Sequence, residues 1–116
     1  MNKICTTIEQ SKKLMELGID VNTADMFYLR ADIALGEIEC YPNVLHREDV
    51  GDDIPAWSLA ALLGLIHNNS YILRNTSVET NRYNIWTIQR KSPVWCKTPL
   101  DAAFEMVCWL LENKKL

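Results

Sequence analysis

Glycine and proline are scarce in this chain, with four of each among 116 residues. Collagen-like and low-complexity chains are rich in these residues, and disordered chains are poor in hydrophobic ones, whereas 48% of this chain is hydrophobic. The glycines at positions 18, 36, 51 and 64 are isolated, so they form no glycine-rich loop that would cradle a phosphate. The composition predicts an ordinary globular domain.

Excess positive charge and long hydrophobic runs are also lacking. Twelve Lys and Arg residues against fifteen Asp and Glu residues give a net charge of −3, so no global positive field attracts duplex nucleic acid or an anionic membrane. The longest strongly apolar stretch, residues 57–66, has about half of the ~20 residues that cross a bilayer. Polar residues interrupt the opening MNKICT, which fits no secretory signal peptide. These features predict a cytoplasmic protein without membrane contact.

Metal-binding motifs are missing as well. No CxxC, HxxxH or HExxH pattern occurs, and Cys40 and His46 stand six residues apart. The acidic run of Glu48, Asp49, Asp52 and Asp53 matches the spacing of no calcium loop. We therefore expect no metal and no other cofactor.

Four cysteines are dispersed along the chain, at Cys5, Cys40, Cys96 and Cys108. The last lies in an apolar run, residues 106–110, and without a secretion signal the set is typical of reduced core thiols rather than of a disulfide framework. A nucleophile would need Cys5 or Cys96 to meet His46 or His67, and no motif supports such a pair. The sequence predicts no catalytic residue.

Residue periodicity and caps predict one domain, residues 1–116, of the α+β class. A helix is expected over residues 7–17, opened by a capping box of either Thr6 with Glu9 or Thr7 with Gln10 and ended by Gly18. Further helices are expected over 55–66, with Pro55 in the first turn behind Asp52 and Asp53, and from the cap Thr98 onward. Short strands are expected at 26–29 and 37–41, although residues 30–35 also fit a helical turn. A hairpin is expected over 71–74 and 82–88, followed by a strand at 94–96. The predicted architecture is a small antiparallel sheet of three to five strands with two or three helices packed mainly on one face.

Three segments, residues 5–26, 53–63 and 98–114, carry a family resemblance. They resemble a family of small uncharacterised proteins encoded by gut anaerobic bacteria, their prophages and mobile elements. The resemblance rests on helix caps and core faces rather than on chemistry. It implies no activity, cofactor or catalytic residue.

Charge is divided unevenly along the chain. Residues 31–66 carry seven acids and one base, a charge of −6, whereas residues 70–98 carry five bases and one acid, a charge of +4. On the second hairpin strand, Arg82, Trp86 and Arg90 share one face by strand alternation. Such a face would stack single-stranded bases and neutralise phosphates. The alternative is that Trp86 and Ile88 lie under a helix with Arg82 and Arg90 at the rim, and that the basic region faces the acidic one, within the fold or across a dimer.

The last helix is apolar on two sides. Leu100, Phe104 and Val107 belong to its main stripe, and Met106, Trp109 and Leu110 widen it. The second side needs cover from the central helix or from a second subunit, so Met106, Trp109 and Leu110 are candidate interface residues. The sequence therefore favours an accessory protein that acts by protein contact, as a homodimer or with another protein. A single-strand nucleic-acid binder is the alternative, and a small enzyme with a hidden site is the third hypothesis.

Overall fold

The computed structural model describes residues 4–36, 38–42, 53–66, 71–75, 82–87 and 95–114. Its main elements, in chain order, are α1 (Ile8–Glu16), β1 (Met26–Tyr28), α2 (Arg30–Ala34), β2 (Cys40–Pro42), β3 (Ile54–Ala56), α3 (Leu59–Ile66), β4 (Tyr71–Asn75), β5 (Tyr83–Thr87) and α4 (Pro99–Glu112). A short 3-10 turn, Val21–Thr23, follows α1. The predicted α+β class is confirmed.

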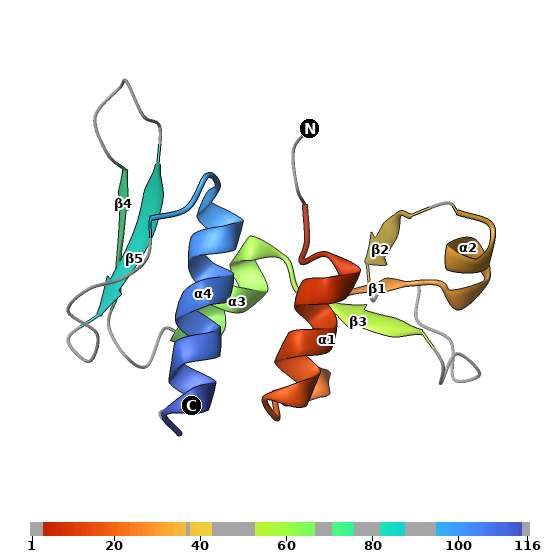
Figure 1. Cartoon of the computed structure of the whole chain (residues 1–116), viewed down its shortest axis with the longest axis horizontal. Coiled ribbons are helices and arrows are strands. Elements are labelled where there is room, and N and C mark those ends of the chain that lie inside the picture. The colour runs from red at the N-terminus through yellow and green to blue at the C-terminus, as the bar shows by residue number, and fades with distance from the viewer. Residues whose placement is uncertain are drawn as a thin grey trace.

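The described strands form two separate antiparallel sheets. One has the order β2-β1-β3, and the other is the β4-β5 hairpin. Figure 1 shows them at opposite ends of the molecule, with α1, α3 and α4 between them. The molecule is accordingly elongated, with extents of 42 × 33 × 22 Å. The helix α1 packs on β3 and α4 packs on β5. The predicted antiparallel sheet of at least three strands is present as β2-β1-β3, and the hairpin forms a second sheet instead of extending it.

Two helices begin where their caps predict. The Thr7 hydroxyl accepts from the Gln10 amide N–H, and the Gln10 side chain accepts from the Thr7 N–H, which completes a capping box for α1. At α4, the Thr98 hydroxyl accepts from the Asp101 N–H, and a proline occupies the first turn. The chain leaves α1 through Gly18, whose φ of +90° suits glycine.

The predicted start of the central helix is wrong. Pro55 lies in β3, opposite Phe27 of β1, and the helix α3 begins only at Leu59. Proline is tolerated there because β3 is an edge strand of its sheet. Asp53 contacts α2 instead of α3. Its carboxylate accepts a hydrogen bond from the backbone N–H of Arg30, at the start of α2, at 3.1 Å. The start of α3 is instead capped by Ser58, which is bonded to Asp25 through both its N–H and its hydroxyl.

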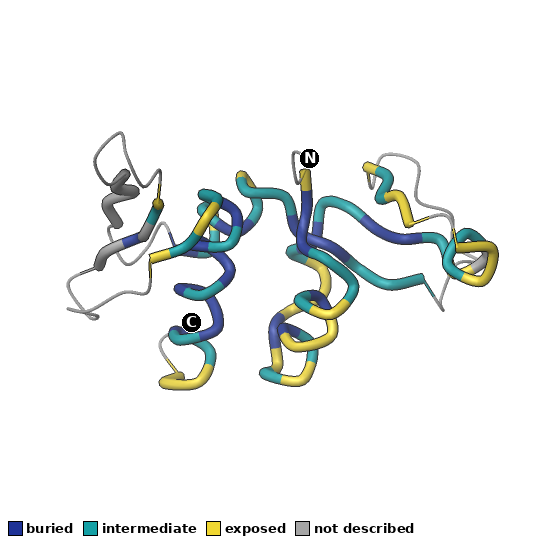
Figure 2. The backbone as a smooth tube through the Cα atoms, turned by 45° about the horizontal axis from the view of Figure 1, so that its top comes forward, coloured by how far each residue is buried: buried dark blue, intermediate teal, exposed yellow. Residues whose placement is uncertain are grey.

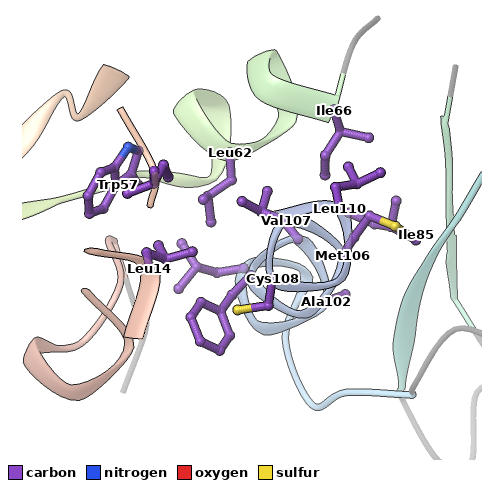
Figure 3. Close-up of a cluster of buried hydrophobic side chains, with 14 of the residues drawn as sticks. Leu14, Trp57, Leu62, Ile66, Ile85, Ala102, Met106, Val107, Cys108 and Leu110 are labelled. Carbon is purple, nitrogen blue, oxygen red and sulfur yellow. The ribbon is translucent and has the colours of Figure 1, made fainter. Parts of the chain in front are cut away.

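The main hydrophobic core lies between α1, α3, α4 and β5. Figure 3 shows α4 at its centre, and Figure 2 shows that α4 is buried along much of its length. Its fully buried side chains come mainly from these four elements and include Leu14, Leu62, Ile66, Ile85, Met106, Val107 and Leu110. The predicted core positions Phe104 and Val107 are 7% and 0% exposed. Within the described ranges, no helix is both long enough and apolar enough to cross a membrane.

Candidate functional site

The hairpin β4-β5 presents one face to the core. Ile85 of β5 is 1% exposed and belongs to the main core. Tyr83 packs against that core and is joined to Cys96 by an antiparallel bridge, with N···O distances of 2.7 and 2.6 Å. Cys96 packs against the same core. Tyr83 and Ile85 of β5 therefore face the core.

The bridge to Cys96 builds an outer face that carries positive charge and an aromatic ring. Antiparallel pairing of Tyr83 with Cys96 sets Arg82 opposite Lys97, and Trp95 next to them. Arg82 and Lys97 are exposed, and Trp95 is 44% exposed. We call Arg82, Trp95 and Lys97 the hairpin face. Two cations beside a tryptophan suit an anionic or an apolar partner.

The predicted nucleic-acid residues are only partly described. Arg82 is exposed, as that hypothesis requires. Trp86 lies in β5, but its side chain and the whole of Arg90 lie outside the described residues. The sequence analysis missed Trp95 and Lys97, although the strand it expected at 94–96 was the signal that would have found them. Ile85, on the opposite face of β5, confirms the predicted alternation on its side of the strand.

Exposed apolar side chains gather at the other end of the molecule. Leu35 is 76% exposed where α2 ends, and Ile38, which precedes β2, is 55% exposed. Glu39, also exposed, lies between Ile38 and Cys40. We call Leu35, Ile38 and Glu39 the β2 end, which is apolar with an acidic member.

The three candidate interface residues of α4 have different surroundings. Met106 and Leu110 are 1% and 0% exposed, so this chain covers them itself. The central helix α3 is one of the elements packed against α4, as the first of the two expected arrangements requires. Trp109 is half-buried and packs against the edge of the same core. An interface at α4 thus remains a prediction for Trp109.

A third feature is a cluster of two cysteines and a tyrosine, Cys5, Cys40 and Tyr28, which we call the thiol cluster. The Cys5 Sγ lies 3.4 Å from the Tyr28 Oη, and Tyr28 is the cross-strand partner of Cys40. Burial raises the pKa of the Cys40 thiol to about 12, and its hydrogen bond to Cys5 adds to this rise. Burial likewise raises the pKa of Tyr28. Cys40 and Tyr28 are therefore protonated at neutral pH.

The Tyr28 hydroxyl joins this cluster to the N-terminal segment. It donates to the Thr6 carbonyl at 2.7 Å, and Thr6 itself is fully buried, with its hydroxyl 2.8 Å from that of Ser11. The Thr6 N–H donates to the Trp57 carbonyl, and the Trp57 N–H donates to the Thr6 hydroxyl. These bonds hold residues 5 and 6 between β1 and the end of β3.

Tyr28→Phe is expected to lower the free energy of unfolding by about 1–3 kcal/mol, because it leaves the buried Thr6 carbonyl without this donor. The matched control is Tyr41→Phe, which removes a hydroxyl that donates to the half-buried Asp32 at 2.8 Å. Its expected cost is about 0.5–1.5 kcal/mol. Urea denaturation measures both values, and a larger loss for Tyr41→Phe would contradict this description of the Tyr28 network.

The remaining candidate residues from the sequence are possible metal ligands and the cysteines. Among the described residues, no group of three or more His, Cys, Asp or Glu side chains is placed to hold a metal ion. His46, His67 and the acids 48, 49 and 52 lie outside the described residues. Cys5, Cys40, Cys96 and Cys108 are free thiols, and burial raises the pKa of Cys108 to about 12.

Comparisons with known proteins found no matching family model, no matching curated protein and no matching solved structure. The resemblance to small proteins of gut anaerobes, prophages and mobile elements therefore stays a prediction. Arguments about function rest on the hairpin face and the β2 end.

Proposed function

We propose that this chain is a cytoplasmic accessory protein that acts by protein contact rather than by catalysis, with a second copy of itself as its partner. One observation carries the proposal. The two ends of the elongated molecule have complementary surfaces, an apolar β2 end with exposed Glu39 and a hairpin face with Trp95 beside two exposed cations. The sequence divides its charge in the same sense, with −6 over residues 31–66 and +4 over residues 70–98.

A two-fold axis would let both ends pair at once. If the β2 end of one copy contacts the hairpin face of the other, the symmetry repeats the same contact at the opposite end. The ends lie apart within one chain, so a second copy is needed to bring them together. Burying Leu35, Ile38 and Trp95 supplies the apolar contribution, at roughly 25 cal/mol per Å² removed from water. Opposite charges fix the orientation and speed association.

Light scattering on the purified protein tests this proposal. At micromolar concentration we expect a mass of twice 13.4 kDa for the unmodified chain. The double variant Leu35→Ser, Ile38→Ser should return the mass to 13.4 kDa, because two exposed apolar side chains leave the interface. The matched control is Val21→Ser, which changes a side chain that is 49% exposed and lies in the turn after α1.

Circular dichroism should show the same fold for all of these variants, because the substituted side chains are exposed. An unmodified chain that stays at 13.4 kDa would refute the dimer. Dissociation of Val21→Ser to the same degree as the double variant would refute the placement of the interface.

Single-stranded nucleic acid is the second candidate partner, favoured by the hairpin face. Trp95 would stack on a base while Arg82 and Lys97 neutralise phosphates. Fluorescence anisotropy of a labelled oligothymidine measures such binding. If this function holds, Trp95→Ala weakens binding by about 1–3 kcal/mol, and added salt weakens it further. The net charge of −3 argues for the protein partner, for which we expect no binding of the oligonucleotide.

A further inference from the structure

Both edge strands of the three-stranded sheet contain a proline. In the described part of the chain, β2 and β3 flank β1, and Pro42 lies in β2 while Pro55 lies in β3. Pro42 stands opposite Met26 of β1, and Pro55 stands opposite Phe27. The edge of a sheet offers unpaired N–H and C=O groups to a strand of another chain, and a proline has no N–H to offer. The two prolines therefore bear on how this end of the molecule can meet a partner.

The register of the strands shows that both proline nitrogens point outward. Residues that face each other in an antiparallel pair alternate between exchanging two N–H···O bonds and exchanging none. Pro42 has no N–H to give to Met26, so the bonded pair is Phe27 with Tyr41. The alternation along β1 then turns the two neighbours of Phe27 toward β3, which makes Phe27 and Pro55 a non-bonded pair. Both nitrogens thus lie on the outer edges of the sheet.

The outer edge of β3 is closed by its proline and by the N-terminal segment. Pro55 faces outward without an N–H. Trp57, the next outward-facing residue along the chain, donates its N–H to the Thr6 hydroxyl at 3.1 Å, and its carbonyl accepts the Thr6 N–H at 2.9 Å. Both Trp57 and Thr6 are fully buried. Over residues 54–57, an incoming strand would therefore find no free N–H at this edge.

The outer edge of β2 is closed less completely. Cys40 and Pro42 face outward, so this edge has one donor, the Cys40 N–H, and two carbonyl acceptors. An antiparallel pairing of two β2 edges, centred on Tyr41, would set Cys40 of each copy opposite Pro42 of the other. Ordinary residues would exchange two bonds at each of these two pairs, and Pro42 removes one bond from each. Its ring also stands where the missing hydrogen would be and holds the opposite carbonyl away.

We propose that Pro42 closes the β2 edge, as Pro55 and Thr6 close the β3 edge, so that the sheet accepts no added strand and the β2 end meets its partner through side chains. The statement about the partner rests on the proposed dimer, whereas the closure of the edges does not. The side chains of Leu35, Ile38 and Glu39 are exposed for such a contact. Apolar burial and charge pairing between side chains need no free strand edge.

Pro42→Thr tests the closure of the β2 edge, because it restores the missing donor. Pro42 is exposed and threonine favours strands, so the fold should be retained. The two added hydrogen bonds should tighten association between β2 edges at least about fivefold. In light scattering over a series of concentrations up to millimolar, the variant should therefore reach a higher mass than the unmodified chain.

Pro99→Thr is the matched control for this variant. It makes the same exchange in the first turn of α4, where the added N–H belongs to no sheet. Its mass should equal that of the unmodified chain at every concentration. A Pro42→Thr variant that associates no more strongly than Pro99→Thr would overturn the closure of the β2 edge.

Amide hydrogen exchange, followed residue by residue by NMR, tests the mode of contact in the unmodified chain. The N–H groups of Phe27, Tyr41 and Trp57 should exchange slowly, because each is hydrogen-bonded. The Cys40 N–H should exchange quickly at both low and high protein concentration, and it should slow only in Pro42→Thr at high concentration. Slow exchange of the Cys40 N–H in the unmodified chain would show that a strand pairs with β2 and would overturn the proposal.

Failure of this proposal and failure of the dimer give different results. If the unmodified chain stays at 13.4 kDa while Pro42→Thr associates, the dimer is refuted and the closed edge is supported. If the unmodified chain is a dimer and Pro42→Thr has the same mass as Pro99→Thr, the dimer is supported and the closed edge is refuted.

Discussion

Phe104→Ala is expected to lower the free energy of unfolding by about 3–5 kcal/mol. Phe104 is 7% exposed and lies in the main core beside other buried residues of α4. The substitution removes an aromatic ring from a small core whose neighbours are held by α1 and α3, so the space cannot fully collapse. A loss of this size is a large part of the ~5–15 kcal/mol that stabilises a typical domain.

Glu112→Ala is the matched control for Phe104→Ala. Glu112 lies in the last turn of the same helix and is exposed, so its removal should change stability by less than about 0.5 kcal/mol. Thermal unfolding followed by circular dichroism measures both variants. A melting temperature that Phe104→Ala leaves unchanged would show that α4 does not pack as described.

Trp57→Ala is expected to be equally severe, with a loss of about 3–5 kcal/mol. Trp57 is fully buried and its ring belongs to the main core, as Figure 3 shows. Its indole N–H donates to the Thr23 hydroxyl at 2.9 Å, and its backbone is bonded to Thr6. The side chain thus ties the segment between β3 and α3 to the turn after α1.

Trp57→Phe separates the two contributions of this side chain. Phenylalanine keeps much of the apolar volume but removes the N–H that Thr23 accepts, so we expect about 1–2 kcal/mol of destabilisation. Guanidinium denaturation of both variants gives the comparison. An alanine variant no less stable than the phenylalanine variant would contradict the core packing of Trp57.

Features set by neighbouring residues were predictable from the sequence. The caps of α1 and α4 depend on side chains three positions from the backbone groups that they satisfy, and both were expected. Gly18 ends α1 for an equally local reason. The stripe of Phe104 and Val107 follows helix periodicity and is buried as expected.

Features set by distant partners were not predictable. Pro55 and Asp53 fit a helix start by local rules, but Pro55 pairs with Phe27 and Asp53 accepts from Arg30. The true cap of α3 needs Asp25, which is 33 positions before Ser58. Local patterns carry no information about such pairings, because they depend on how the chain returns to itself.

The residues of the candidate sites also divide into those that a local pattern predicts and those that depend on a distant segment. Arg82 was identified from the alternation of its own strand, whereas Trp95 and Lys97 join the hairpin face only through the bridge between Tyr83 and Cys96. The contact of Cys5 with Tyr28 likewise requires the N-terminal segment to lie beside β1. In each case the missed residues belong to a separate stretch of chain.

A charge-exchange experiment tests the end-to-end dimer most directly. Glu39→Lys makes the β2 end positive, and Lys97→Glu reverses one cation of the hairpin face, so each variant alone opposes like charges at both contacts of the dimer. Both side chains are exposed, which leaves the fold unchanged. Mixing the two variants places opposite charges at both contacts.

The masses of the separate variants and of their mixture test the pairing of the β2 end with the hairpin face. At low salt, light scattering should give close to 13.4 kDa for each variant alone and close to twice that value for the equimolar mixture. Separate variants that dimerise as well as the unmodified chain does, or a mixture that stays at 13.4 kDa, would contradict the pairing of the β2 end with the hairpin face.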